Sequence, residues 1–203
     1  MASAVPTCRR QGLFRYEHRS RGVLGWLVLF GIGLLIWLTW VSQRASRFDG
    51  IELRGTRNFT DHVVSALTLL RTKAPEAYGI VTNCIKVIVQ SAHTGMAAYA
   101  NPPTSHLHDK VEWESLQGFA SGIAHESFHS KLYLDRQREL GASAVVPDDA
   151  WTGETAEMLC CQHQARVLRR IGGSEAEISY YDWDPTRDPT NRYWEVPYEK
   201  RNW

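Results

Sequence analysis

The longest apolar run of the chain lies near its N-terminus. Between Arg21 and Arg44 the sequence has 22 consecutive uncharged residues, most of them apolar. At 1.5 Å of rise per helical residue, this run reaches about 33 Å, which is long enough to cross the hydrocarbon core of a bilayer. A buried core helix seldom stays apolar on every face for this length, and the run exceeds the apolar region of a signal peptide. The pattern therefore predicts a transmembrane helix over residues 22–43.

Apolar positions after residue 58 follow first helical and then strand spacing. Val63, Leu67 and Leu70 recur at helical spacing, and Pro75 opens a second helical stretch. From Ile85, alternating β-branched residues predict a strand. The segment after that strand contains glycine, prolines and polar residues, which favour an edge strand followed by a loop.

Two longer helices are predicted in the second half of the chain. One runs from residue 115 to about 134, and the other from about residue 152 to 171, where Gly172 and Gly173 end it. Ser174 could begin a short successor through a capping box. The remaining residues contain three prolines among aromatic and charged side chains, which predicts an irregular tail. Helices combined with a few short strands indicate an α+β fold.

These segments divide the chain into five predicted regions. The regions are a basic tail at 1–21, a transmembrane helix at 22–43, a linker at 44–58, one folded domain at 59–181 and an irregular aromatic tail at 182–203.

The distribution of charge predicts an orientation in the membrane. The chain has 23 basic and 22 acidic residues, so its net charge of +1 gives no reason to expect binding to nucleic acid. Five of the arginines lie within residues 1–21, and a short tail of this kind is costly to translocate. We therefore expect a single-pass membrane protein in contact with the lipid bilayer. Its N-terminus would be cytoplasmic, and its C-terminal domain would lie on the non-cytoplasmic side.

One motif in the first of the two longer helices carries chemistry. His125, Glu126 and His129 form an H-E-x-x-H arrangement. Histidines four residues apart lie on one face of a helix, so both imidazoles can reach a single metal ion. The glutamate beside the first histidine can then face a water at an open coordination position.

A catalytic zinc site usually has a third protein ligand, which must come from elsewhere in the chain. Glu154 and Glu157 lie three residues apart on the next predicted helix, and therefore on nearly the same face. Glu157 is deeper inside that helix, so it is the first choice, with Glu154 as the alternative. Cys160, Cys161 and His163 are rival ligands on the same segment.

These residues resemble those of the gluzincin branch of the zincin metallopeptidases, over about residues 74–173. The resemblance implies a small zincin-like domain with a short edge-strand sheet and two metal-bearing helices. It also implies zinc as the cofactor, with His125 and His129 as ligands. Glu157 would be the third ligand and Glu126 the catalytic base. Lys131 departs from the family pattern, which usually has an uncharged residue there.

The expected function is that of a membrane-anchored zinc metallopeptidase acting on a protein or peptide near the membrane. A zinc-bound water would attack the peptide carbonyl while Glu126 takes its proton and later passes it to the leaving amine. A further hydrogen-bond donor would stabilise the oxyanion. The candidates for this donor are Tyr133, His163, Tyr180 and Tyr181.

The small domain and the aromatic tail leave a second class of function open. The alternative is a zincin-like structural or binding subunit of a membrane protein complex, with or without zinc. In that case the tail at 182–203, which is rich in tryptophan and tyrosine, would face a partner.

Overall fold

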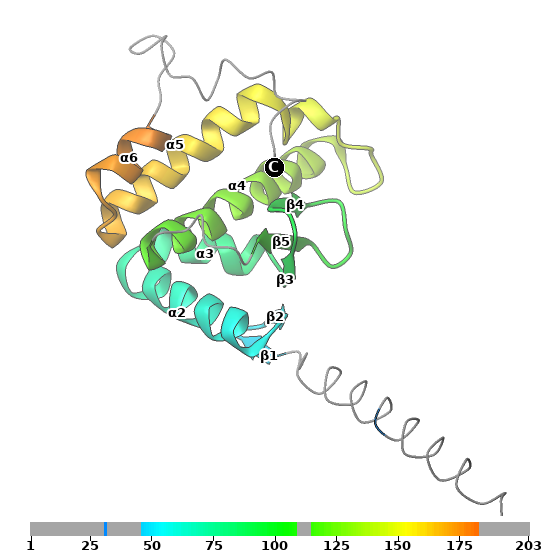
Figure 1. Ribbon diagram of the computed structural model, residues 1–203. Helices are drawn as coiled ribbons and strands as arrows, with labels where there is room; N and C mark the ends of the chain where they lie inside the picture. Colours follow the sequence, from blue (N-terminus) through cyan, green and yellow to red (C-terminus); the bar gives the residue numbers. More distant parts are fainter. Residues whose placement is uncertain (1–30, 32–45, 109–114, 183–203) are drawn as a thin grey trace, which may run out of the picture. The chain divides into compact units, whose positions relative to one another are not determined.

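The computed structural model describes Gly31 and residues 46–108 and 115–182 (Figure 1). The chain divides into two units, residues 1–41 and 42–203. Gly31 is the one described residue of the first unit, so the fold below is that of the second. The aromatic tail predicted from residue 182 lies outside the described residues, except for Asp182.

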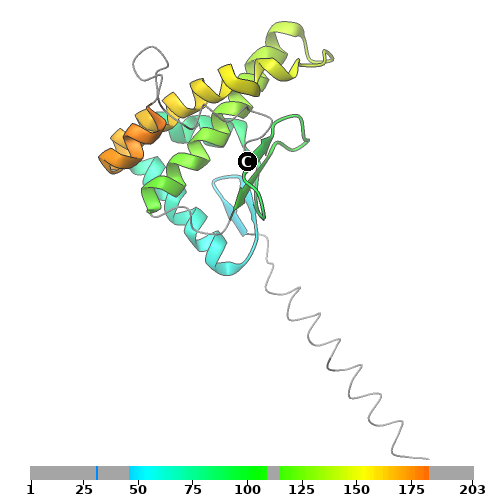
Figure 2. The same ribbon diagram turned by 45° about the horizontal axis from the view of Figure 1, so that its top comes forward.

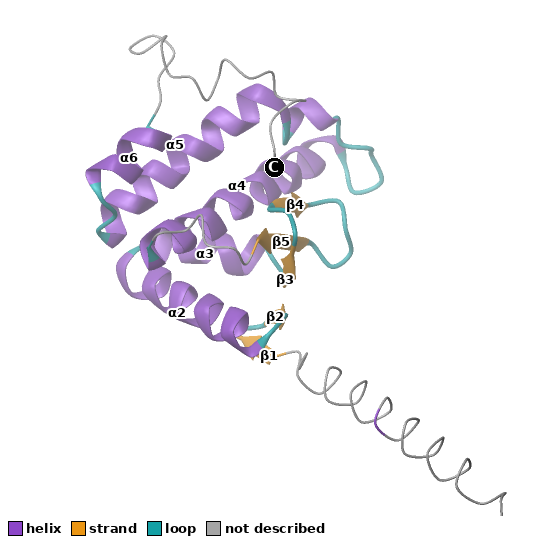
Figure 3. Ribbon diagram, viewed as in Figure 1, coloured by secondary structure: helices purple, strands orange, loops and turns teal. Residues whose placement is uncertain are grey.

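A five-stranded mixed sheet forms one layer of the described domain (Figure 3). Its order is β1-β2-β3-β5-β4, with β2, β3 and β5 parallel and the two edge strands antiparallel to their neighbours. The predicted edge strand is therefore present as β4. The strands are β1 (Ser46–Phe48), β2 (Ile51–Arg54), β3 (Val87–Ser91), β4 (Gly95–Ala97) and β5 (Thr104–His108).

Helices cover this sheet and begin at residues suited to capping. Thr56 and Ser115 accept hydrogen bonds at the starts of α2 and α4, and Ser174 forms a capping box with Glu177. The predicted stop at Gly172 is confirmed, because this residue has the left-handed conformation that ends α5. The helices are α2 (Arg57–Lys73), α3 (Pro75–Cys84), α4 (Leu116–Leu140), α5 (Gly153–Ile171) and α6 (Glu175–Tyr181), with a short 3₁₀ turn at Asp148–Ala150.

Helix α4 is the central element of the domain. It packs against α2, α3, α5 and the strands β4 and β5, and Figure 2 shows it lying between α5 and α2. Every residue from 118 to 127 is buried, on all faces of the helix. Small residues such as Gly118, Ala120 and Gly122 allow neighbouring elements to pack close to the backbone of α4. A motif placed on this part of α4 is therefore held by the core.

The segment 44–58, expected to be a linker, contains two strands of the sheet. β1 and β2 pair through a tight turn at Asp49 and Gly50, which both have positive φ, of 45° and 86°. This backbone favours Asp-Gly and joins antiparallel strands with the correct twist. Ile51 and Leu53 point into the core with no exposed surface. This part of the chain is therefore a buried part of the sheet and not a linker. The polar residues around Ile51 and Leu53 make their burial hard to recognise in the sequence.

The expected transmembrane helix and single-pass membrane localisation are also corrected. Among the described residues, no helix has an apolar stretch long enough to cross a membrane. The longest one, α4, has 25 residues but includes charged side chains such as Lys131, Asp135 and Arg136. The fold supported here is an α+β domain without a described membrane-spanning helix. Residues 22–43 lie outside the described residues, apart from Gly31.

Candidate metal centre

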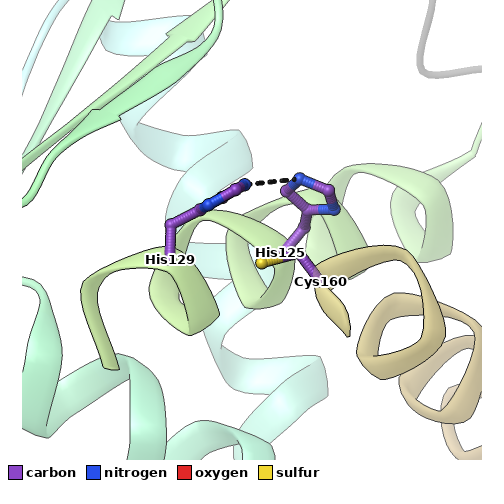
Figure 4. Close-up of side chains that lie close together, drawn as sticks. All are labelled: His125, His129 and Cys160. Carbon is purple, nitrogen blue, oxygen red and sulfur yellow. Dashed lines mark hydrogen bonds between the residues drawn. The ribbon is translucent and has the colours of Figure 1, made fainter. Parts of the chain in front are cut away.

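Helix α4 brings the two histidines of the H-E-x-x-H motif together. The Nε2 atoms of His125 and His129 lie 3.1 Å apart, and both side chains are buried (Figure 4). Glu126, between them in sequence, is also buried and lines the same cavity. The helical spacing predicted from the sequence is confirmed at this point.

The motif is anchored by hydrogen bonds from buried serine and glutamine side chains around it. The hydroxyl of Ser130 donates to the carbonyl oxygen of Cys84, over 2.8 Å, and so ties α4 to the end of α3. Ser127 and Ser121 donate to carbonyl oxygens within α4, and Gln164 on α5 donates to Ser121. A helix fixed on both sides in this way positions its imidazoles with little freedom.

Helix α5 brings Glu157, and not Glu154, to the two imidazoles. One carboxylate oxygen of Glu157 lies 3.0 Å from Nε2 of His129, and the other lies 3.3 Å from Nε2 of His125. Glu157 is 3% exposed, whereas Glu154 is exposed at the start of the helix. The structure therefore places the first-choice third ligand at the site and leaves the alternative outside it.

The orientation of His129 is set by a backbone group that the sequence reasoning missed. Nδ1 of His129 lies 2.8 Å from the carbonyl oxygen of Trp151. Since a carbonyl only accepts, Nδ1 carries the hydrogen, and in the neutral ring Nε2 keeps a lone pair directed at the site. Metal-binding histidines commonly have such a partner on their second nitrogen. A backbone carbonyl has no sequence signature, so no pattern could have identified Trp151 in this role.

Glu157 gives the site a negative charge beside two histidines whose pKa values are raised, so a metal ion would have to displace their protons. Burial alone would raise the pKa of Glu157, but its contacts with His125 and His129 lower that pKa to about 2. Burial would lower the pKa of His125, but its contacts with Cys161 and Glu157 outweigh burial and raise it to about 10. Burial raises the pKa of the Glu126 carboxyl. Glu157 is thus anionic at neutral pH, while Glu126 binds a proton more readily than an exposed glutamate.

The spacing of the three donors fits a metal ion. In a tetrahedral zinc site with bonds of about 2.0–2.1 Å, neighbouring donor atoms lie about 3.3 Å apart. Here the two Nε2 atoms lie 3.1 Å apart, Oε1 of Glu157 lies 3.0 Å from Nε2 of His129, and Oε2 of Glu157 lies 3.3 Å from Nε2 of His125. In addition, Oε2 of Glu157 is buried and, among the described residues, makes no hydrogen bond of good geometry, although Nε2 of His125 lies 3.3 Å away. A buried carboxylate oxygen without a donor is costly, and a cation between the three side chains would satisfy it.

Two cysteines of α5 widen the set of possible ligands. His125, His129 and Cys160 form one buried group that could hold a metal ion, and His125, Glu157 and Cys161 form another. Within each group the donor atoms lie within 4.8 Å of one another. Figure 4 shows the sulfur of Cys160 beside the two facing imidazoles. The centre therefore offers nitrogen, oxygen and sulfur donors at the same place.

A cavity of about 240 Å³ opens onto this centre. The chain from Thr94 to Met96, which includes the start of β4, forms one wall, and Trp151 and Thr152 contribute to another. The buried indole Nε1 of Trp151 has no hydrogen-bond partner among the described residues. The residues that line the cavity are Thr94, Gly95, Met96, His125, Glu126, His129, Trp151, Thr152 and Glu157.

None of the four expected oxyanion donors lines this cavity. Tyr133 packs edge-on against Trp151, and His163 stacks on Phe128. Tyr180 and Tyr181 lie on α6, against each other. Lys131, which departs from the family pattern, pairs with Asp135 and does not line the cavity.

Comparison with known proteins does not identify a family for this chain. No family model matches the chain, and neither the curated proteins nor the solved structures give a match. The likeness to gluzincins therefore rests on the residues of the motif and on the glutamate of α5.

Proposed function

We propose that this protein is a zinc-dependent peptidase. The observation that supports the proposal is the group of His125, His129 and Glu157, in which each imidazole nitrogen lies 3.0 to 3.3 Å from the other nitrogen and from one oxygen of the carboxylate, in the wall of a cavity that Glu126 also lines. Three protein ligands beside an accessible space are typical of catalytic zinc sites.

Zinc is the proposed ion because of the donors present. Two imidazoles and one carboxylate form a common ligand set for catalytic zinc, and a nearby thiol is also compatible with this borderline-soft ion. Bound there, zinc would act as a Lewis acid towards a substrate carbonyl and would acidify a water molecule. The carbonyl of Trp151 would keep Nε2 of His129 directed at the ion.

Glu126 is proposed as the group that moves the proton. It follows His125 directly on α4, so it reaches the same cavity without competing for the position of either imidazole. Its raised pKa, caused by burial, makes the carboxylate a better base than an exposed glutamate. Glu126 would accept a proton from the attacking water and donate it to the leaving amine.

The edge of the sheet supports a peptide as the substrate. β4 is the last strand in the sheet order, hydrogen-bonded to β5 on one side, and Gly95 and Met96 on it line the cavity. An extended peptide can pair with the free edge of such a strand and place its backbone in front of the adjacent site. Glycine at position 95 leaves room for a backbone to approach.

A second candidate function is a metal-binding domain without catalytic activity. Cys160, which is completely buried beside both imidazoles, favours it. A fourth protein ligand would close the coordination of the ion, as in structural zinc sites.

The proposal is tested by a change that removes the base and keeps the ligands. The full chain is loaded with zinc, and hydrolysis of a mixed peptide library is followed by mass spectrometry. Glu126→Gln should keep its zinc and lose activity by about 10²- to 10⁴-fold, whereas Glu154→Gln, at an exposed position on α5, should keep both. Zinc-loaded protein that cleaves no peptide, or Glu126→Gln with full activity, would contradict the proposal.

A further inference from the structure

Cys160 has no role in the proposed reaction, yet it lies at the metal centre. Its side chain is completely buried, and its sulfur belongs to a compact group with ring nitrogens of His125 and His129 (Figure 4). Apolar burial alone would explain a cysteine at this place. It does not explain why the sulfur lies within 4.8 Å of a ring nitrogen of both histidines.

The arrangement follows from the spacing on α5. Glu157 and Cys160 are three residues apart, so they share a face of the helix, and that face is turned towards the histidines of α4. Two helices thus contribute two donors each, with His125 and His129 from one and Glu157 and Cys160 from the other. Either residue of α5 could therefore add a donor to the two imidazoles.

We propose that Cys160 is a ligand of the metal, through its thiolate, together with His125 and His129. This inference rests on the metal site of the proposed function and deepens it. On binding, the sulfur–hydrogen bond of Cys160 is replaced by a sulfur–metal bond, and the proton passes to solvent. The group of His125, His129 and Cys160 supplies three ligands, so a fourth position remains for Glu157 or for a water molecule.

Cys161 is the matched alternative. It is also buried, but the compact group to which it belongs contains His125 and Glu157 and omits His129. Cys160 instead lies with both imidazoles of the H-E-x-x-H motif, so its thiolate can join a site in which both histidines participate. Substitution of Cys160 and substitution of Cys161 should therefore give different results in the same experiment.

Cobalt(II) is the probe, because its visible bands report binding and geometry, while a near-ultraviolet charge-transfer band reports a thiolate ligand. The full chain is loaded with cobalt as the wild type, Cys160→Ala and Cys161→Ala. We expect the charge-transfer band in the wild type and in Cys161→Ala, and its loss in Cys160→Ala, with visible bands in all three. Circular dichroism of each variant checks that it is folded.

Each alternative result has a definite meaning. Visible bands without a charge-transfer band in the wild type overturn the role of Cys160 while leaving a peptidase with three ligands intact. Loss of the band in Cys161→Ala alone assigns the thiolate to Cys161 and also overturns it. A charge-transfer band in a protein that cleaves no peptide supports the role of Cys160 and contradicts the proposed function. If Cys160→Ala does not fold, cadmium NMR of the wild type decides whether a sulfur ligand is present.

Discussion

Nδ1 of His129 lies 2.8 Å from the carbonyl oxygen of Trp151, across 22 residues of sequence. This contact joins the face of α4 that bears His125 and His129 to the residue that precedes α5 by two positions. It fixes both the tautomer and the orientation of one imidazole, which are prerequisites for binding a metal ion with a defined geometry.

Trp151 should therefore influence metal affinity without touching the ion. Its indole packs against Tyr133 and Tyr99, so Trp151→Ala removes the packing that holds the carbonyl in place. We expect this variant to bind zinc about 10- to 100-fold more weakly, as for other partners of metal-binding histidines. Trp151→Phe keeps an aromatic ring and should stay close to the wild type. Competition with a chromogenic chelator measures both affinities, and equal affinities for the wild type and Trp151→Ala would refute the role.

Glu157→Gln should show which of the two glutamates of α5 contributes to zinc affinity. The amide retains the size of the side chain but removes the negative charge beside His125 and His129, so zinc affinity should fall by at least about 10-fold. Glu154→Gln is the matched control, because residue 154 is exposed. Isothermal titration calorimetry with zinc checks both variants. A loss confined to Glu154→Gln would mean that the third ligand has been assigned wrongly.

Metal binding should stabilise the fold, because its ligands come from two different helices. Zinc at 100 times its dissociation constant adds about 2.7 kcal/mol to the free energy of unfolding, which for a chain of this size raises Tm by about 5–10 °C. Differential scanning fluorimetry with zinc, and again after a chelator is added, measures the shift. His129→Ala should show no shift, and a shift of the same size in that variant would place the zinc elsewhere.

The start of α4 depends on a carboxylate from α6. The hydroxyl of Ser115, which caps α4, donates to Glu177, and Ser174 donates to the same carboxylate. The hydrogen bond from Ser115 is the main reason that the pKa of Glu177 lies below its usual value of 4.5.

The sign of the pH dependence follows from this lowered pKa. Glu177 stabilises the fold fully above the pKa of an unfolded glutamate, and this contribution is lost as the pH falls through the lower pKa of the folded state. Glu177→Gln should therefore be less stable than the wild type at pH 7, and the difference should shrink at pH 3. Urea denaturation at the two pH values tests this. A difference that is unchanged at pH 3 would show that the charge of Glu177 does not contribute.

The sequence predicted those parts of the site that depend on local periodicity. The spacing of His125 and His129 fixed their common face, and the depth of Glu157 in its helix distinguished it from Glu154. Both helices also have strong signals at their ends, such as Ser115 and Gly172. These features are determined by residues within a few helical turns of one another.

Features that depend on how separate elements pack were missed or, as for Cys160, left as one option among several. β1 and β2 have three and four residues, too few for a clear alternation, although Asp49-Gly50 is a recognisable hairpin signal. The approach of Cys160 to the imidazoles and the contact of Trp151 with His129 arise from how α5 packs on α4. The transmembrane prediction used the length and uniform apolarity of residues 22–43, which lie outside the described residues apart from Gly31, and no helix of the described residues supports it.

Anomalous diffraction at the zinc edge, from crystals of the zinc-loaded chain, would locate the ion relative to His125, His129 and Glu157. A single strong peak should lie within about 2.0–2.2 Å of Nε2 of His125, Nε2 of His129 and a carboxylate oxygen of Glu157. A chain that takes up zinc but has no anomalous peak between these three side chains would contradict the account.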